Sequence, residues 1–172
     1  MRKNVYLIQP SYHTAGGKLM KKWNTFANCI NLPILSASIP SEWNKEVCFE
    51  FFDEINFNSD AQIIIISYMG FDIVHTKKIA ANFKEKNKVV ILACCQYLFS
   101  NHLLGQICDT VFRGYPNYTE MKTLLNDGLN QNLNKEYIFH FRMNSTFDYS
   151  ILKGKKIGYV PQQSILFSGS IE

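Results

Sequence analysis

His13 is the side chain in this sequence whose type and setting point most clearly to chemistry. It lies in the loop Ser11-Tyr12-His13-Thr14-Ala15-Gly16-Gly17, which follows a short apolar run ended by Pro10. Imidazole is a common metal ligand that changes charge near neutral pH. The paired glycines let the backbone come close to a bound group. The plainer interpretation is a loop histidine hydrogen-bonded to a neighbour, because short motifs often match by chance.

Further candidates follow apolar runs that predict strands. Ser67, Tyr68 and Met69 come directly after four consecutive isoleucines, residues 63–66. A β-branched apolar run without alternation predicts a strand buried on both faces. Ligands bind at the carboxyl ends of the strands in an open parallel sheet. Residues after the other expected strands complete the candidate set: Cys94, Cys95, Gln96, Arg113, Gly114 and Tyr115.

Each of these candidates also has a structural interpretation. Ser67 can cap a helix that begins near Asp72. The two cysteines are more typical of small buried hydrophobic residues than of reactive thiols, and Gly114 is typical of a tight turn. Five tyrosines at expected loops either stack on a flat ligand or simply cover the sheet edge: Tyr12, Tyr68, Tyr97, Tyr115 and Tyr118.

Alternating strand and helix patterns place these loops. The patterns predict strands at 4–9, 46–52, 61–67, 89–93 and 109–113, and helices at 18–31, 72–86 and 119–129, with short ones within 31–40 and 100–106. This order predicts an α/β fold with a doubly wound, mainly parallel, five-stranded Rossmann-like (flavodoxin-like) sheet and helices on both faces. We assign residues 1–130 to this domain and residues 131–172 to a linker or extension, in which residues 137–142 and 156–160 are expected to be extended.

Composition narrows the function classes. The chain has 172 residues, of which 47% are hydrophobic and 19% charged, as in one globular domain with an extension. A net charge of +4 from scattered lysine pairs does not indicate nucleic-acid binding. Five cysteines without Cys-x-x-Cys spacing, and no signal or membrane segment, predict a reduced cytoplasmic protein. The sequence has neither a Gly-x-Gly-x-x-Gly loop nor a phosphate loop ending in Gly-Lys-Ser/Thr, which disfavours a nucleotide-binding enzyme of either type.

Four stretches together resemble the amino-terminal cobalamin-binding domain of cobalamin-dependent radical S-adenosylmethionine enzymes. They span residues 5–10, 31–43, 65–69 and 111–119, so the resemblance covers about 5–129. The His13 loop is similar to the Asp-x-His-x-x-Gly loop of methionine-synthase-like cobalamin domains, with Ser11 in place of the aspartate. The resemblance implies that His13 binds cobalt from below and that these residues contact the cofactor: Ser11, Tyr12, His13, Gly16, Ser67, Tyr68, Met69, Cys94, Cys95, Gln96, Arg113, Gly114 and Tyr115.

The resemblance implies a corrinoid-binding module of a methyltransferase-like enzyme that does not catalyse alone. The iron–sulfur cluster and S-adenosylmethionine would belong to a downstream radical domain, because the Cys-x-x-x-Cys-x-x-Cys motif is not in this sequence. The chain departs from the family at Cys94-Cys95, which replaces two glycines, and at Tyr115 and Asn117, which replace acids. These departures favour an alternative, a cofactor-free docking or substrate-shielding domain. A flavin-binding or response-regulator-like protein ranks third.

Overall fold

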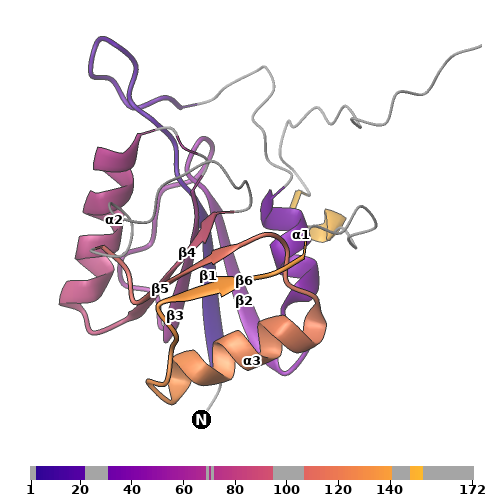
Figure 1. The fold of residues 1–172 in the computed structure, drawn as a ribbon. Coiled ribbons are helices and arrows are strands. Elements are labelled where there is room, and N and C mark those ends of the chain that lie inside the picture. Colours follow the sequence, from indigo (N-terminus) through magenta and orange to yellow (C-terminus); the bar gives the residue numbers. More distant parts are fainter. Residues whose placement is uncertain are drawn as a thin grey trace, which may run out of the picture.

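The computed structural model describes residues 3–21, 31–68, 70, 72–94, 107–140 and 148–152. Within these ranges, six strands form one parallel sheet in the order β2-β1-β3-β4-β5-β6 (Figure 1). The strands are β1 (Lys3–Gln9), β2 (Trp43–Phe49), β3 (Ile63–Ser67), β4 (Val89–Cys94), β5 (Thr110–Arg113) and β6 (Glu136–Ile138). The helices are α1 (Asn31–Ser38), α2 (Ile73–Glu85), α3 (Tyr118–Leu129) and the short 3-10 helix η2 (Tyr149–Leu152). The predicted α/β class with a parallel sheet is confirmed.

The predicted count of five strands is wrong, because β6 adds a sixth strand to the sheet. The Val111 N–H donates to the Lys135 carbonyl at 3.4 Å, and the Phe139 N–H donates to the Arg113 carbonyl at 2.9 Å. These bonds flank the three residues that pair with β5. Residues 137–142 are expected to be extended, but so short a strand has no periodicity that shows whether it joins a sheet, and only its pairing partner reveals it as β6. The sheet therefore extends past residue 130.

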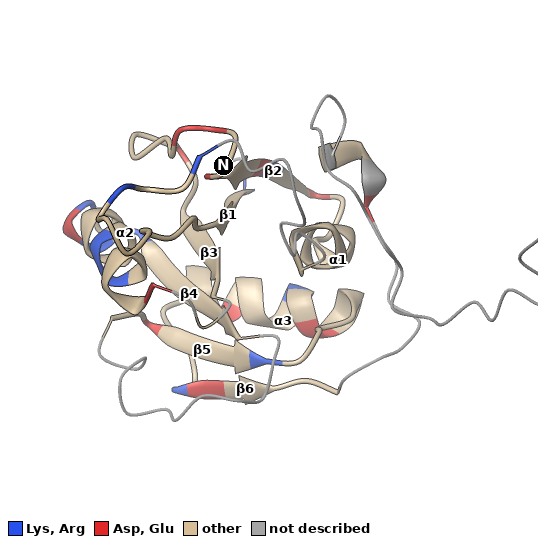
Figure 2. Ribbon diagram, turned by 90° about the horizontal axis from the view of Figure 1, so that it is seen from above, with Lys and Arg blue, Asp and Glu red and all other residues tan. Residues whose placement is uncertain are grey.

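Helices cover both faces of the sheet. Leu32 and Leu35 of α1 pack with Leu124 of α3 against one face, and Ile79 and Phe83 of α2 pack against the other. Figure 2, seen from above, shows α2 on one side of the sheet and α1 and α3 on the other. All five residues of β3 are buried, as the isoleucine run predicts.

Local side-chain caps fix where two of the helices begin. Asp72 is the N-cap of α2, and its side chain accepts a hydrogen bond from the His75 N–H. Asn117 is the N-cap of α3 and forms a capping box with Glu120. None of the helices in the described ranges is long and apolar enough to span a membrane.

Residues 18–20 form part of a hairpin, so the prediction of a helix starting at residue 18 is wrong. The hairpin, called the His13 hairpin below, comprises residues 11–20. The Thr14 N–H donates to the Lys18 carbonyl and the Met20 N–H to the Tyr12 carbonyl, both at 2.9 Å. Gly17, at φ 75°, makes the turn that brings the two arms together. Residues 22–30, 100–106 and 156–160, also predicted as regular structure, lie outside the described ranges.

Candidate functional site

The candidate site lies where the chain order of the sheet reverses. β1 is hydrogen-bonded to β2 on one side and to β3 on the other, so the connections from these strands diverge at their carboxyl ends. Ligands in open α/β sheets bind at such a switch point. The His13 hairpin follows β1, Glu50 follows β2, and Asp72 and His75 follow β3. The topology therefore brings four titratable side chains to one place.

The first pair of this site joins His13 to Asp72. The His13 ring Nδ1 lies 2.6 Å from Asp72 Oδ2, and the His13 backbone N–H donates to the same oxygen at 3.0 Å. Burial favours a higher pKa for Asp72. The hydrogen bonds from the His75 N–H and from the ring and N–H of His13 outweigh burial and lower the Asp72 pKa to about 2. Asp72 is therefore an ionised carboxylate at neutral pH.

This pairing decides which ring nitrogen of His13 is available. An ionised carboxylate only accepts hydrogen bonds, so Nδ1 of His13 carries a proton, and in the neutral form of the ring the lone pair is on Nε2. The His13 side chain is 36% exposed, and among the described residues none bonds Nε2. The structure thus shows the plainer interpretation, a loop histidine bonded to a neighbour, with its Nε2 unbonded by the described residues.

Ser11 does not orient His13. Its hydroxyl donates to the Met20 carbonyl inside the hairpin, and its N–H donates to Glu50 Oε2 at 2.8 Å. The orienting acid comes instead from the cap of α2, far along the chain. Sequence analysis identified Asp72 only as a helix-terminus acid, because a contact between loops after β1 and β3 leaves no spacing signal in the sequence.

Sequence analysis did not predict the second pair, Glu50 with His75. His75 Nε2 lies 2.8 Å from Glu50 Oε2 and 3.0 Å from Oε1. The side chains are 13% and 7% exposed, respectively. A glutamate placed directly after a buried strand was the only signal, and it lay inside a stretch predicted to be strand. The rings of His13 and His75 meet edge to face, with centroids 5.0 Å apart.

Ser67 lies at the end of β3 with its hydroxyl unsatisfied. The residue is 1% exposed, and among the described residues its Oγ has no hydrogen-bond partner; the same holds for Gln9 Oε1 at the end of β1. Asp72 is the cap of α2, so Ser67 does not serve as one. A cavity of about 10 Å³ is lined by Gln9, Pro10, Ser11, Ser67, Tyr68, Asp72 and Thr76.

Cys94 lies on the opposite face of the sheet from Ser67. In the register of β3 and β4, Ser67 pairs with Ala93. Ala93 belongs to the core beneath α1 and α3, whereas Cys94 belongs to the core beneath α2. The Cys94 thiol therefore does not narrow the space beside Ser67. Burial raises its pKa to about 12, which fits a structural residue rather than a reactive thiol.

The candidates after β5 are engaged by the protein itself. Arg113 Nε donates to Glu136 Oε1 at 2.6 Å, and the Tyr115 hydroxyl lies 2.5 Å from Asn31 Oδ1. Gly114 has φ 77°, and a Cβ there would overlap the Phe139 carbonyl oxygen. The chain leading out of β6 thus fills the place beside Gly114.

Of the remaining candidates, Tyr12 and Tyr68 pack on the protein itself, and Tyr97 lies outside the described residues. Tyr12 packs edge to face on Phe51 at 5.9 Å, and Tyr68 is buried in the core beneath α2. Gly16 is an exposed residue of the hairpin tip, where a Cβ would find only Thr14 Oγ1 at 3.8 Å. Three predicted contact residues lie outside the described ranges: Met69, Cys95 and Gln96.

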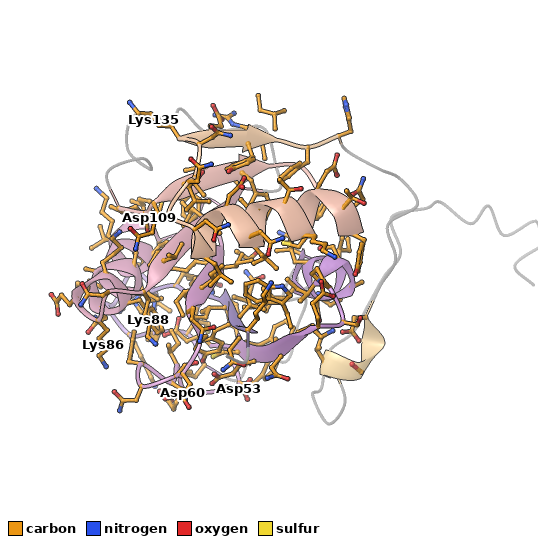
Figure 3. The ribbon with its side chains drawn as sticks, turned by 90° about the horizontal axis from the view of Figure 1, so that it is seen from below. Asp53, Asp60, Lys86, Lys88, Asp109 and Lys135 are labelled. Atoms are coloured by element: carbon orange, nitrogen blue, oxygen red, sulfur yellow. The ribbon has the colours of Figure 1, made fainter. Side chains whose placement is uncertain are left out.

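The opposite end of the sheet carries charges that serve the fold. Asp109 Oδ2 accepts the Val90 N–H at 2.8 Å, and its other oxygen pairs with Lys84. Lys86 Nζ donates to the Phe57 carbonyl at 2.8 Å. Figure 3, seen from below, labels Lys86, Lys88 and Asp109 among the side chains of this end. These contacts tie loops to β4 and to the end of α2. Two cavities, of about 390 Å³ and 480 Å³, also lie at this end of the sheet.

Within the described ranges, no three His, Cys, Asp or Glu side chains are grouped to hold a metal ion. No family model, no curated protein and no solved structure matches this chain.

Proposed function

We propose that this domain binds a corrinoid, cobalamin, over the carboxyl edge of its sheet, as the binding module of a methyltransferase-like radical S-adenosylmethionine enzyme. The observation that carries the proposal is the His13 imidazole, bonded through Nδ1 to Asp72 at 2.6 Å. A carboxylate behind a metal-binding imidazole fixes its tautomer and raises its basicity. A corrin ring brings its own equatorial nitrogen donors, so one imidazole is sufficient as the protein ligand.

The strand order supports this proposal. The first five strands follow the order β2-β1-β3-β4-β5, which is that of flavodoxin-like sheets with a ligand at the β1/β3 switch point. We infer the same Rossmann-like arrangement here, extended by β6. The Ser67 hydroxyl and the side-chain oxygen Oε1 of Gln9, neither of which has a partner among the described residues, lie at this switch point and can hydrogen-bond a polar ligand group.

The residues present fit the metal half of a corrinoid better than its nucleotide tail. His13 would hold the metal, and Ser67 and Gln9 would meet polar groups of the cofactor. The cavity beside them, about 10 Å³, holds about one water molecule. When bound, the corrinoid supplies a cobalt centre able to accept and donate a methyl group. The iron–sulfur cluster and S-adenosylmethionine would be held by a downstream domain, so this chain binds without catalysing.

The second candidate function is a cofactor-free docking or substrate-shielding domain of the same fold. Two observations favour it: the small cavity beside Ser67, and the Phe139 carbonyl that occupies the place beside Gly114. In this alternative the His13–Asp72 pair is a structural contact that fixes the hairpin. The two candidates differ in one measurable property, retention of a corrinoid.

The experiment incubates the purified chain with hydroxocobalamin, removes the excess by gel filtration and records the visible spectrum. We expect the wild type to retain corrinoid and His13→Ala to show a shifted spectrum. His140→Ala is the matched control, because His140 is exposed and lies after β6, away from the site. Folded wild-type protein without retained corrinoid would overturn the proposal and favour the docking alternative.

A further inference from the structure

We propose that Glu50 and His75 are positioning residues that hold the His13 hairpin over the carboxyl edge of the sheet. That Glu50 and His75 hold the hairpin is argued from their contacts alone. That this helps His13 to bind a ligand rests on the proposed function. The pair links residues from the loops after β2 and β3 to the base of the hairpin after β1.

Glu50 anchors the base of the hairpin. Its own N–H donates to the Gln9 carbonyl at 3.0 Å, which continues the β1–β2 ladder by one residue and fixes its backbone. Its carboxylate then accepts the Ser11 N–H at 2.8 Å. The residue is 5% exposed, so its side chain has little access to water. The first residue of the hairpin is thus tied to the end of β2.

His75 joins this anchor to the cap of α2. Its backbone N–H donates to Asp72 Oδ1 at 2.8 Å, and its ring Nε2 bonds the Glu50 carboxylate. Asp72, through its other oxygen, holds the His13 ring. One helical residue therefore contacts both carboxylates that bond the hairpin backbone at Ser11 and His13.

The ring of His75 also supports the ring of His13 directly. The two planes meet at 88° with centroids 5.0 Å apart, an edge-to-face contact. Asp72 constrains His13 at Nδ1, and His75 restricts tilting of the ring. Together they hold His13 in one orientation with Nε2 unbonded by the described residues.

Burial makes this arrangement sensitive to each partner. A buried carboxylate is stable only while hydrogen-bond donors satisfy it. Glu50 has two kinds of donor, the His75 ring and the Ser11 N–H. Loss of the ring removes a donor and the support of His13 at once. Loss of the carboxylate releases the Ser11 N–H from its only acceptor among the described residues.

The test measures amide hydrogen exchange in the chain without any corrinoid, in wild type, Glu50→Ala, His75→Leu and Glu50→Gln. We expect exchange at Ser11 and His13 to rise about tenfold or more in Glu50→Ala and His75→Leu, through local opening. Glu50→Gln keeps an acceptor for the Ser11 N–H and should restore most of that protection. Lys78→Gln on the exposed face of α2 is the control and should match the wild type.

A second readout separates positioning from general stability. The nitrogen shifts of the His13 ring at neutral pH should report the Nδ1–H tautomer in wild type and a mixture of tautomers in His75→Leu. Unchanged exchange at Ser11 and His13, with an unchanged His13 tautomer in folded Glu50→Ala and His75→Leu, would overturn the inference. If wild type retains no corrinoid while the variants loosen the hairpin, the proposed function fails and the positioning role stands.

Discussion

The two halves of the carboxyl edge of this sheet differ in how far the protein itself uses their polar groups. In the described part of the half formed by β4, β5 and β6, the protein itself uses Arg113, Gly114 and Tyr115, as when the Phe139 carbonyl lies against Gly114. In the half formed by β1, β2 and β3, two carboxylates hold two imidazoles, while Ser67 Oγ has no partner among the described residues. The difference teaches that a candidate site is marked less by residue type than by polar groups the fold does not use.

The largest expected effect is on stability in the half of the edge formed by β4, β5 and β6. Gly114→Ala should lower the free energy of unfolding by about 3 kcal/mol, because φ is positive and the new Cβ would lie 2.9 Å from the Phe139 carbonyl carbon. Gly16→Ala, on the hairpin tip, should change it by less than about 0.5 kcal/mol. Urea unfolding measures both. Equal effects would remove the contrast between the two halves.

The next effect concerns the half of the edge formed by β1, β2 and β3. Asp72→Ala removes the cap of α2 and the acceptor of the His13 ring, so the free energy of unfolding should fall by about 1–2 kcal/mol. Asp72→Asn keeps a capping oxygen and should lose less, about 0.5–1 kcal/mol. A thermal or urea unfolding series ranks the three proteins. An alanine variant as stable as wild type would show that the pair contributes nothing to the fold.

A smaller effect appears in acid. The pKa of Asp72 falls from 3.8 to about 2 on folding, so the folded state holds this carboxylate ionised more strongly than the unfolded state. Its stabilisation is complete above the unfolded value and is lost as the pH falls through the folded value. The stability difference between wild type and Asp72→Asn should therefore shrink between pH 4 and pH 2. Unfolding curves across this range check it, and a constant difference would contradict the pairing.

The smallest expected effect is at Ser67. Ser67→Ala removes a buried hydroxyl that has no partner among the described residues, so stability should stay the same or rise by up to about 1 kcal/mol. Under the proposed function, the same variant should retain less corrinoid than wild type. A loss of stability of the size expected for Gly114→Ala would mean that the hydroxyl already serves the fold.

Local patterns predicted most of the fold. The isoleucine run forms β3, and residues 119–129 form most of α3, as predicted. Strand burial and helix period show in the spacing of residues that are close in the sequence. The His13 hairpin was not predicted, and the stretch predicted to be extended at 137–142 was not assigned to the sheet, where it contributes to β6. Each depends on pairing with another segment, and a spacing that suited a helix from residue 18 was outweighed by the turn at Gly17.

The site was predicted only in part, and for the same reason. Sequence analysis identified His13 and Ser67 because each follows a recognisable strand. It missed the Glu50–His75 pair and the role of Asp72, since partners 25 and 59 residues apart meet only through the sheet order. The face of the sheet on which Cys94 lies could have been predicted from strand alternation. Cys94 follows Ala93 in β4, so the two side chains point to opposite faces.

The most direct measurement of the central claim is the electron paramagnetic resonance spectrum of the corrinoid-loaded protein after reduction to cobalt(II). An axial nitrogen splits the cobalt lines into triplets when it is nitrogen-14 and into doublets when it is nitrogen-15. Protein labelled with nitrogen-15 histidine should give doublets that disappear in His13→Ala and persist in His140→Ala. Triplets from the labelled protein, or lines without nitrogen splitting, would contradict ligation by His13.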